Sequence, residues 1–147
     1  MGKRQISVTR TIATTPEKIF ELLTDPAQHP VLDGSGSVRA VQPGGPERLE
    51  LGSKFGMDMK MGASYKILNT VVEFEQDRLI AWRHFGGHRW RWQLKPLAGN
   101  KTEVTETFDW STAKTPTLMR LTPFPRRNKI GMEKTLEKLS QIFPAQT

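Results

Sequence analysis

The sequence predicts an α+β fold in which a curved antiparallel sheet of about seven strands wraps around a long C-terminal helix. Apolar and polar residues alternate with a period of two through residues 5–12 and much of residues 37–110, which is typical of strands with one covered face. Apolar residues recur at helical spacing near the C-terminus. A sheet of consecutive antiparallel strands needs a cover, and this helix is the only long segment that can provide one. We expect a single domain over residues 1–147.

Short helices are expected between the first strand and the second. Thr15 and Pro16 predict a helix start, with Thr15 as the N-cap and Pro16 at the first helical position. Asp25 and Pro26 end this helix, because the residue before a proline avoids the helical region. A second helical turn is expected within residues 27–32.

The strands after these helices are expected to share one inner face. The predicted strands are residues 37–42, 53–61, 65–74 and 102–110, together with a hairpin over residues 79–96. The positions expected to share a face within each strand are Phe55, Met57, Met59 and Met61, then Leu68, Thr70, Val72 and Phe74, and finally Val104, Glu106, Phe108 and Trp110.

The C-terminal segment is predicted to be helical. A short piece is expected near residues 116–121, a break at residues 123–125, and then a long helix to Phe143. Its apolar stripe consists of Met132, Leu136, Leu139 and Phe143, with Gly131 and Thr135 beside it. A glycine inside a helix costs about 1 kcal/mol relative to alanine, so Gly131 indicates close packing or room left for another group.

The hairpin over residues 79–96 holds three of the four tryptophans. A two-residue loop of Gly86 and Gly87 would place an arginine on the covered face, which is costly. A three-residue loop, residues 86–88, is therefore favoured, with Trp82 opposite Trp92. In that register the inward residues are Ile80, Trp82, His84, Trp90, Trp92 and Leu94, and the outward residues are Arg83, Arg89, Arg91 and Lys95.

Two rows of inward side chains are then expected to cross the sheet. One row is Thr70, His84, Trp90 and Phe108, and the other is Val72, Trp82, Trp92 and Glu106. A buried carboxyl group needs a partner or takes up a proton. The indole N–H of Trp82 or Trp92 and the ring of His84 are the candidate partners of Glu106, whereas His29 and His88 are expected in loops.

The order of these elements resembles the helix-grip superfamily, also called SRPBCC or START-like. This superfamily includes START lipid-transfer domains, Bet v 1-like proteins and small bacterial proteins similar to polyketide cyclases and dehydrases. The resemblance rests on residues 15–20, 72–74, 79–83 and 102–106 and on the final helix led by Arg126 and Arg127. It implies a cavity between sheet and helix that binds a hydrophobic small molecule.

The resemblance favours a binding protein for a lipid, polyketide or aromatic metabolite. Methionine suits such a cavity because it adapts to irregular apolar shapes, although it serves equally well as core filler. The expected ligand-binding residues are Met57, Met59, Val72, Trp82, His84, Trp90, Trp92, Glu106, Phe108 and Met132. A filled core in which His84 and Glu106 satisfy each other is the alternative. A second hypothesis is an enzyme of the polyketide cyclase or dehydrase type that uses His84 and Glu106 as acid and base.

Composition and charge set the remaining expectations. The chain has no cysteine, its three histidines are scattered, and we expect neither a metal site nor a cofactor. It has no apolar stretch long enough for a membrane span and no recognisable leader, so a cytoplasmic monomer or homodimer is expected. The net charge of +7 fits a solvated basic surface. A third hypothesis uses this surface, through Arg83, Arg89 and Arg91, to bind an anionic membrane or, less readily, nucleic acid.

Overall fold

The computed structural model describes residues 4–36, 38–61, 63–84, 87–113 and 124–145. Its elements follow the expected order of strand, short helices, six strands and long helix. They are β1 (Gln5–Ile12), α1 (Pro16–Leu23), the 3-10 turn η1 (Pro26–Gln28), α2 (His29–Leu32), β2 (Val38–Val41), β3 (Lys54–Met61), β4 (Ala63–Glu75), β5 (Leu79–Arg83), β6 (Arg89–Leu97), β7 (Lys101–Asp109) and α4 (Phe124–Ile142).

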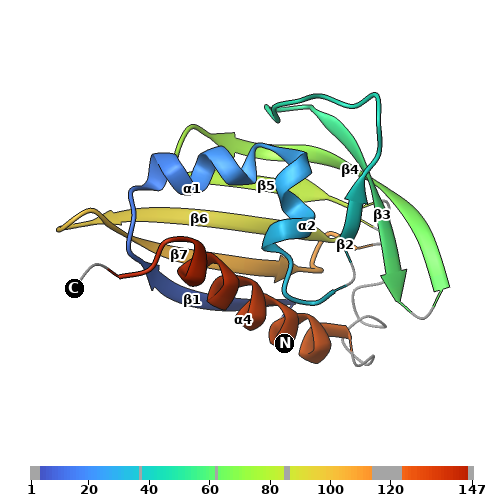
Figure 1. Ribbon diagram of the computed structural model, residues 1–147. Helices are drawn as coiled ribbons and strands as arrows, with labels where there is room; N and C mark the ends of the chain where they lie inside the picture. Colours follow the sequence, from blue (N-terminus) through green and yellow to red (C-terminus); the bar gives the residue numbers. More distant parts are fainter. Residues whose placement is uncertain (1–3, 37, 62, 85–86, 114–123, 146–147) are drawn as a thin grey trace.

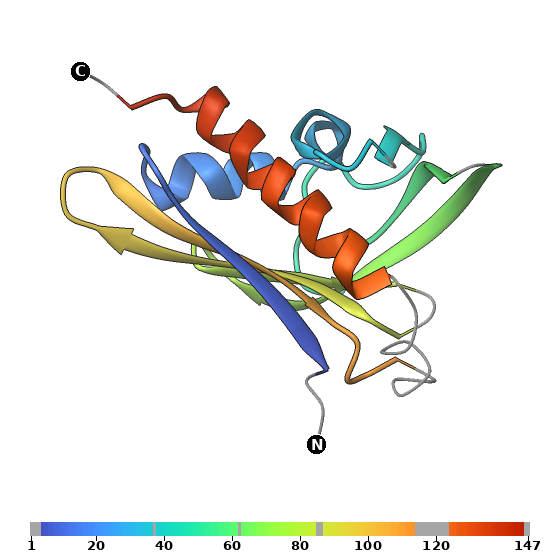
Figure 2. The same cartoon turned by 90° about the horizontal axis from the view of Figure 1, so that it is seen from below.

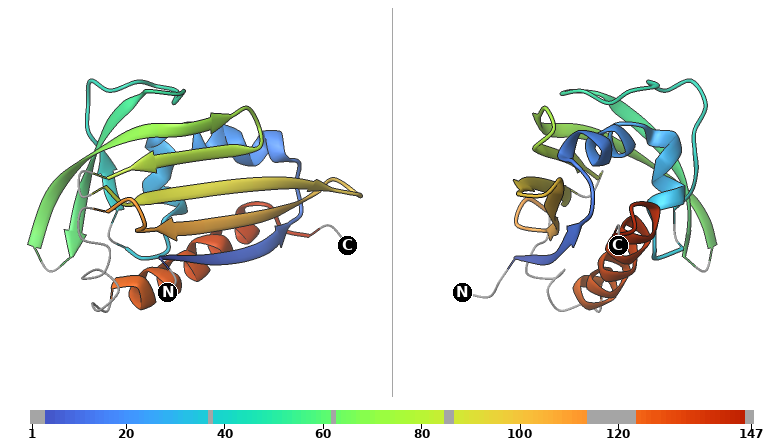
Figure 3. Two further views of the ribbon diagram at one scale, coloured as in Figure 1. Left: turned by 180° about the vertical axis from the view of Figure 1, so that it is seen from behind. Right: turned by 60° about the vertical axis from the view of Figure 1, so that its left-hand side comes forward.

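The seven strands form one antiparallel sheet in the order β1-β7-β6-β5-β4-β3-β2 (Figure 1). Helix α4 crosses one face of the curved sheet, and α1 and α2 lie on the same side of it (Figure 2). Seen along the sheet, the strands form one wall and the helices form the other (Figure 3). This arrangement confirms the predicted α+β, helix-grip fold.

The start of α1 differs from the prediction in one respect. Thr15 occupies the N-cap with an extended backbone and Pro16 is the first helical residue, but the Thr15 side chain makes no capping hydrogen bond. At the other end, the hydroxyl group of Thr24 donates to the carbonyl oxygen of Phe20 at 2.9 Å. The predicted helical piece at residues 116–121 lies outside the described residues.

The predicted hairpin register is wrong by two residues. Trp82 pairs with Trp90, not with Trp92, and Arg83 pairs with Arg89. The backbone N–H of His84 donates to the carbonyl oxygen of His88 at 2.9 Å, so three residues separate the two paired histidines. A shift by two residues leaves each side chain on the same face. The tryptophans therefore still face inward, although their cross-strand partners differ.

A bulge in β4 overturns the predicted facing of Val72. Val71 pairs with Trp82 and Glu73 with Ala81, so Val72 is the extra residue. Because of this extra residue, the side chains of β4 before Val72 face the side opposite to the predicted one. Ile67 is therefore 8% exposed and Leu68 is 53% exposed. Neither Thr70 nor Val72 joins the inner rows as predicted. The pairs of Trp90 with Phe108 and of Trp92 with Glu106, in contrast, are confirmed.

Helix α4 buries the predicted apolar stripe. Met132, Leu136 and Leu139 are buried, and Phe143 packs partly buried against the same core. The loop before β2 also contacts this helix: the backbone N–H of Gly34 donates to the hydroxyl group of Thr135 at 2.9 Å. The helix thus contacts both the sheet and the segment that follows α2.

The arginines of the hairpin lie on the outer face of the sheet, as predicted, but two of them are ion-paired. Arg91 contacts Glu73 at 2.8 Å and Asp109 at 3.4 Å, and Arg89 contacts Glu73 at 3.2 Å. Arg83 is exposed. Glu73, which the sequence analysis did not single out, thus neutralises part of the predicted basic surface.

Among the described residues, no helix combines the length and the apolar composition needed to cross a membrane.

Candidate functional site

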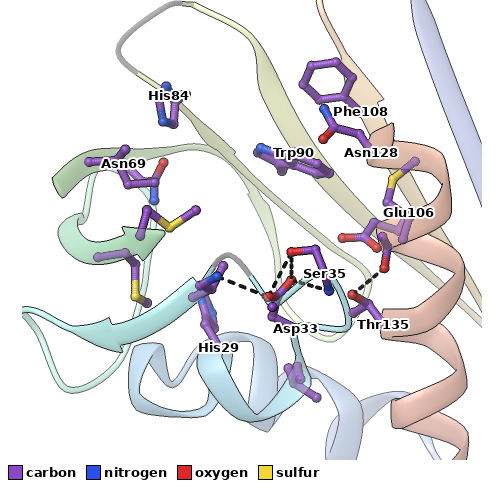
Figure 4. A pocket seen from close by; sticks show the side chains of 18 of the residues that line it. His29, Asp33, Ser35, Asn69, His84, Trp90, Glu106, Phe108, Asn128 and Thr135 are labelled. Atoms are coloured by element: carbon purple, nitrogen blue, oxygen red, sulfur yellow. Dashed lines mark hydrogen bonds between the residues drawn. The ribbon is translucent and has the colours of Figure 1, made fainter. Parts of the chain in front are cut away.

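A cavity of about 650 Å³ lies between the inner face of the sheet, α4 and the segment from α2 to β2 (Figure 4). This volume is within the range of small-molecule sites. Nine of the ten residues predicted to bind a ligand line it: Met57, Met59, Trp82, His84, Trp90, Trp92, Glu106, Phe108 and Met132. Val72 does not line the cavity, because of the bulge in β4.

Aromatic and thioether side chains from the sheet and the helices form much of the cavity wall. Trp90 packs against Phe108 with ring centroids 4.9 Å apart, and Met57 and Met132 are almost fully buried. Trp82 stacks on His29, with centroids 4.8 Å apart. Such a wall favours a ligand with flat or irregular apolar surface.

Glu106 is the most unusual group in this wall. Its side chain is 6% exposed, and its Oε1 has no hydrogen-bond partner among the described residues. Burial, reinforced by the negative charge of Asp33, raises the pKa of Glu106 well above its usual value. Burial therefore favours the protonated form of the group, which is a neutral hydrogen-bond donor and acceptor.

The predicted partners of Glu106 do not bind it. Trp92 lies directly opposite on β6, yet its Nε1 also lacks a hydrogen-bond partner within the described part of the chain. Arg89 pairs with Asp109, so the preceding residue, His88, lies across from Trp110. His84, which is bonded to His88, lies at the same position along the sheet. Trp110 is four residues beyond Glu106, so the two histidines are about 13 Å from Glu106 in the strand direction.

His84 and Glu106 consequently lie at different ends of the cavity (Figure 4). The alternative in which they satisfy each other within a filled core is wrong. An acid–base mechanism that joins them in one hydrogen-bonded pair is not available in this structure. Each of them could contact only its own part of a bound molecule.

His29 and His88 both line the cavity. His88 lies in the loop between β5 and β6, as predicted, whereas His29 is the first residue of α2 and not a loop residue. The Nε2 of His29 lies 2.8 Å from the carbonyl oxygen of Leu23. Because a carbonyl group only accepts, Nε2 carries the proton, and Nδ1 is an acceptor in the neutral ring. Burial lowers the pKa of His29, against the opposing effect of this hydrogen bond, and so favours the neutral ring.

His84 and His88 stack on each other with ring centroids 4.6 Å apart. Burial, together with the neighbouring His84, lowers the pKa of His88 to about 4. Burial likewise lowers the pKa of His84. Both rings are therefore neutral at pH 7, and this end of the cavity carries no positive charge from the histidines.

We expect this histidine pair to make the protein less stable in mild acid. As the pH falls below 6.5, the unfolded chain binds a proton at His88 that the folded chain does not bind, so the free energy of unfolding decreases. Between pH 7 and pH 5, wild type should lose about 1–2 kcal/mol more than His88→Phe, which keeps a ring and removes the titration. Urea unfolding at both pH values measures the difference, and equal losses would contradict the prediction.

The opening of the cavity is basic, in contrast to its interior. Four exposed cations, spread over β2, β3 and α4, are among the lining residues: Arg39, Lys60, Arg127 and Lys134. Within the described ranges, none of them forms an ion pair at 4.0 Å or less. A charged group of a ligand would therefore meet positive charge at the rim and neutral or acidic groups inside.

The segment from Asp33 to Gly36 is a part of the site that the sequence analysis missed. The carboxylate of Asp33 accepts hydrogen bonds from the backbone N–H groups of Ser35 and Val38, and it also accepts one from the Ser35 hydroxyl group. The Asp-Gly-Ser-Gly composition predicts a turn. Nothing in the local pattern shows that this turn contacts α4 and lines a cavity. Across the described residues, no cluster of three or more potential metal ligands occurs.

Comparison with known proteins agrees with this architecture. Residues 3–143 match the family described as "Polyketide cyclase / dehydrase and lipid transport". The chain is 38% identical to "Uncharacterized protein Rv0088" of Mycobacterium tuberculosis strain H37Rv over 97% of its own length. It is 37% identical to "Uncharacterized protein MT0096" of strain CDC 1551. The chain spans 65% of the length of these two relatives.

Solved structures share the fold at low sequence identity. Protein Ms6760 from Mycobacterium smegmatis matches with a TM-score of 0.71 and 14% identity, covering 95% of this chain and 90% of that one. The Aha1 dimer from Colwellia psychrerythraea matches with a TM-score of 0.69 and 18% identity, covering 95% of each chain. These structures support the fold, and the match over residues 3–143 establishes the family. The chain belongs to the polyketide cyclase/dehydrase and lipid-transport family.

Proposed function

We propose that this protein binds a hydrophobic small molecule, of the lipid, polyketide or aromatic class, in the cavity between the sheet and α4. The observation that carries the proposal is the cavity itself, which has a volume of about 650 Å³ and a wall rich in tryptophan, phenylalanine and methionine. A cavity of this size is costly to leave in a core unless something occupies it. The family, whose description includes lipid transport, supports the same function.

The ligand would lie against the inner face of the hairpin. Trp82 and Trp90, which pair across β5 and β6, would offer their rings to its apolar body. Met59 and Met132 would adapt to its shape from β3 and α4. Binding of such a molecule would bury apolar surface on both sides, at about 25 cal/mol per Å².

A variant that fills the cavity tests this proposal. We expect Met59→Trp to weaken binding of the neutral dye Nile red at least tenfold, because the added indole volume occupies part of the cavity. The matched control is Leu68→Trp, which places the same indole on β4 at an exposed position outside the cavity and should bind as wild type does. Dye emission titrations measure both affinities. Equal affinities for the two variants, or no dye binding by wild type, would refute the proposal.

Native mass spectrometry of the purified protein supplies an independent test. We expect a mass increment in the native spectrum that disappears on denaturation, as a co-purified ligand would give. The proposal predicts that Leu68→Trp keeps this increment and that Met59→Trp reduces it.

A second candidate function is proton-transfer catalysis on the bound molecule. The observation that favours it is the buried carboxyl group of Glu106 in the cavity wall, whose pKa is raised and whose Oε1 has no hydrogen-bond partner among the described residues. Because His84 lies far from it, Glu106 would act as an acid without a histidine partner. For any compound that the protein converts, Glu106→Gln should abolish turnover and retain binding, whereas His84→Phe should leave the acid step intact. Unchanged turnover in Glu106→Gln would exclude this function.

A further inference from the structure

The neighbouring side chains of Glu106 and Trp92 form a polar spot in a largely apolar part of the wall. The two residues are directly opposite on β7 and β6, so their Cβ atoms lie about 5 Å apart. Both side chains line the cavity and both are more than nine-tenths buried. Glu106 Oε1 and Trp92 Nε1 have no hydrogen-bond partner among the residues that the structure describes. Two neighbouring buried polar groups without hydrogen-bond partners lower the free energy of unfolding, unless a bound molecule satisfies them.

The hydrogen-bonding capacity of this spot limits what can satisfy it. The indole N–H of Trp92 only donates, so its partner must carry an acceptor. An ammonium group has no acceptor and leaves this N–H unsatisfied. A hydroxyl or carbonyl oxygen can accept from Trp92 and bond with the carboxyl group of Glu106 as well.

Charge argues against an anionic acceptor, such as a carboxylate or phosphate group, at this position. A carboxylate or phosphate group placed at Glu106 would be buried, and the nearby carboxylate of Asp33 would repel it. Asp33 cannot offer it a donor, because it already accepts hydrogen bonds from Ser35 and Val38. The exposed cations that could bind an anion lie at the rim, on Arg39, Lys60, Arg127 and Lys134.

From these contacts we infer that the ligand enters with a neutral oxygen group, a hydroxyl or a carbonyl, which hydrogen-bonds to Glu106 and Trp92. This inference rests on the proposed ligand-binding function and adds the chemistry of the buried end of the ligand. Any anionic group of the same molecule stays at the basic rim. A fatty acid would therefore not bind with its carboxylate inside.

Three naphthalene probes of equal ring size test the inference on the full chain at pH 7. They are 2-naphthol, which is neutral, 2-naphthoate, which is anionic, and 2-(aminomethyl)naphthalene, which is cationic. Each is titrated as a competitor of Nile red. We expect 2-naphthol to displace the dye at a concentration at least tenfold lower than either charged probe.

Variants assign the preference to the polar spot. Glu106→Gln keeps a neutral donor and acceptor and should keep the preference for 2-naphthol. Glu106→Leu should reduce it to less than threefold. Trp92→Phe, which removes the indole N–H together with part of the ring, should weaken binding of 2-naphthol more than binding of the charged probes. The matched control is Glu103→Gln, on the same strand but outside the cavity lining, which should behave as wild type does.

The outcomes separate this inference from the proposed function. Failure of wild type to bind Nile red refutes ligand binding itself. Nile red binding without a preference for 2-naphthol, or with a preference that survives in Glu106→Leu, overturns the inference and leaves the binding function standing.

Discussion

Replacing Gly34 with alanine is expected to lower the free energy of unfolding by about 3 kcal/mol or more. A Cβ atom at Gly34 would lie 2.4 Å from the backbone carbon of Lys134 and 2.4 Å from the backbone nitrogen of Thr135. These atoms belong to α4 and cannot turn aside as a side-chain tip could. The loop would have to move off the helix, which breaks the hydrogen bond from the Gly34 N–H to Thr135. Overpacking against a rigid partner costs about 1–3 kcal/mol, and loss of this hydrogen bond adds to it.

Gly45→Ala is the matched control for this substitution. A Cβ atom at Gly45 meets only the carbonyl oxygen of Gln42, at 4.0 Å, which is ordinary contact. Its effect should stay within about 0.5 kcal/mol. Urea unfolding followed by tryptophan fluorescence measures both variants. A loss below 1 kcal/mol in Gly34→Ala would show that the loop and α4 do not pack as closely as described.

The same substitution also tests the cavity, because Asp33 and Ser35 line it on either side of Gly34. If the loop moves away from α4, the cavity opens to solvent at that point. Affinity for Nile red should then fall in Gly34→Ala under conditions where the variant is still folded. Gly45→Ala should keep the wild-type affinity.

The inner faces of most strands could be predicted because they depend only on alternation. Met57, Trp90 and Phe108 lie inside as expected, and a register error of two residues in the hairpin did not change this. The bulge at Val72 is different. It inserts one residue and so changes which side chains of β4 face inward. Its neighbours are Val71 and Glu73, so no adjacent glycine or proline indicates it in the sequence. Whether a bulge forms there depends on how the strand must bend over the core.

The helical side of the cavity was harder to predict than the sheet side. His29 reaches Trp82 only because α2 folds back over the sheet, and Gly34 meets α4 across one hundred residues of sequence. No local periodicity encodes contacts of that kind. Glu106 shows the same limit in another way. The alternation of side chains along β7 predicts that it faces inward. That its Oε1 has no hydrogen-bond partner among the described residues depends on the positions of all its neighbours.

Glu106→Gln is expected to stabilise the protein at neutral pH, because it removes the cost of folding with a buried carboxyl group whose pKa is raised. In wild type the folded state keeps a proton on Glu106, because burial raises the pKa of its carboxyl group, while the unfolded chain releases that proton above pH 4.5. The folded state thus binds more protons, so the free energy of unfolding falls as the pH rises through this interval. The slope for one proton is about 1.4 kcal/mol per pH unit. Glutamine has the same shape, stays neutral at every pH and removes this slope.

The pH dependence of the stabilisation by Glu106→Gln distinguishes an effect of the raised pKa from an effect of improved packing. At pH 4 the side chain is mostly protonated in both states, so wild type and Glu106→Gln should have nearly equal stability. The difference should then grow as the pH rises above 4.5, whereas Glu103→Gln should change stability by less than about 0.5 kcal/mol. Urea unfolding across this range measures it, and a constant difference would refute the explanation. A residue that costs stability at neutral pH and yet lines the cavity is the expected signature of a group kept for its contact with a ligand.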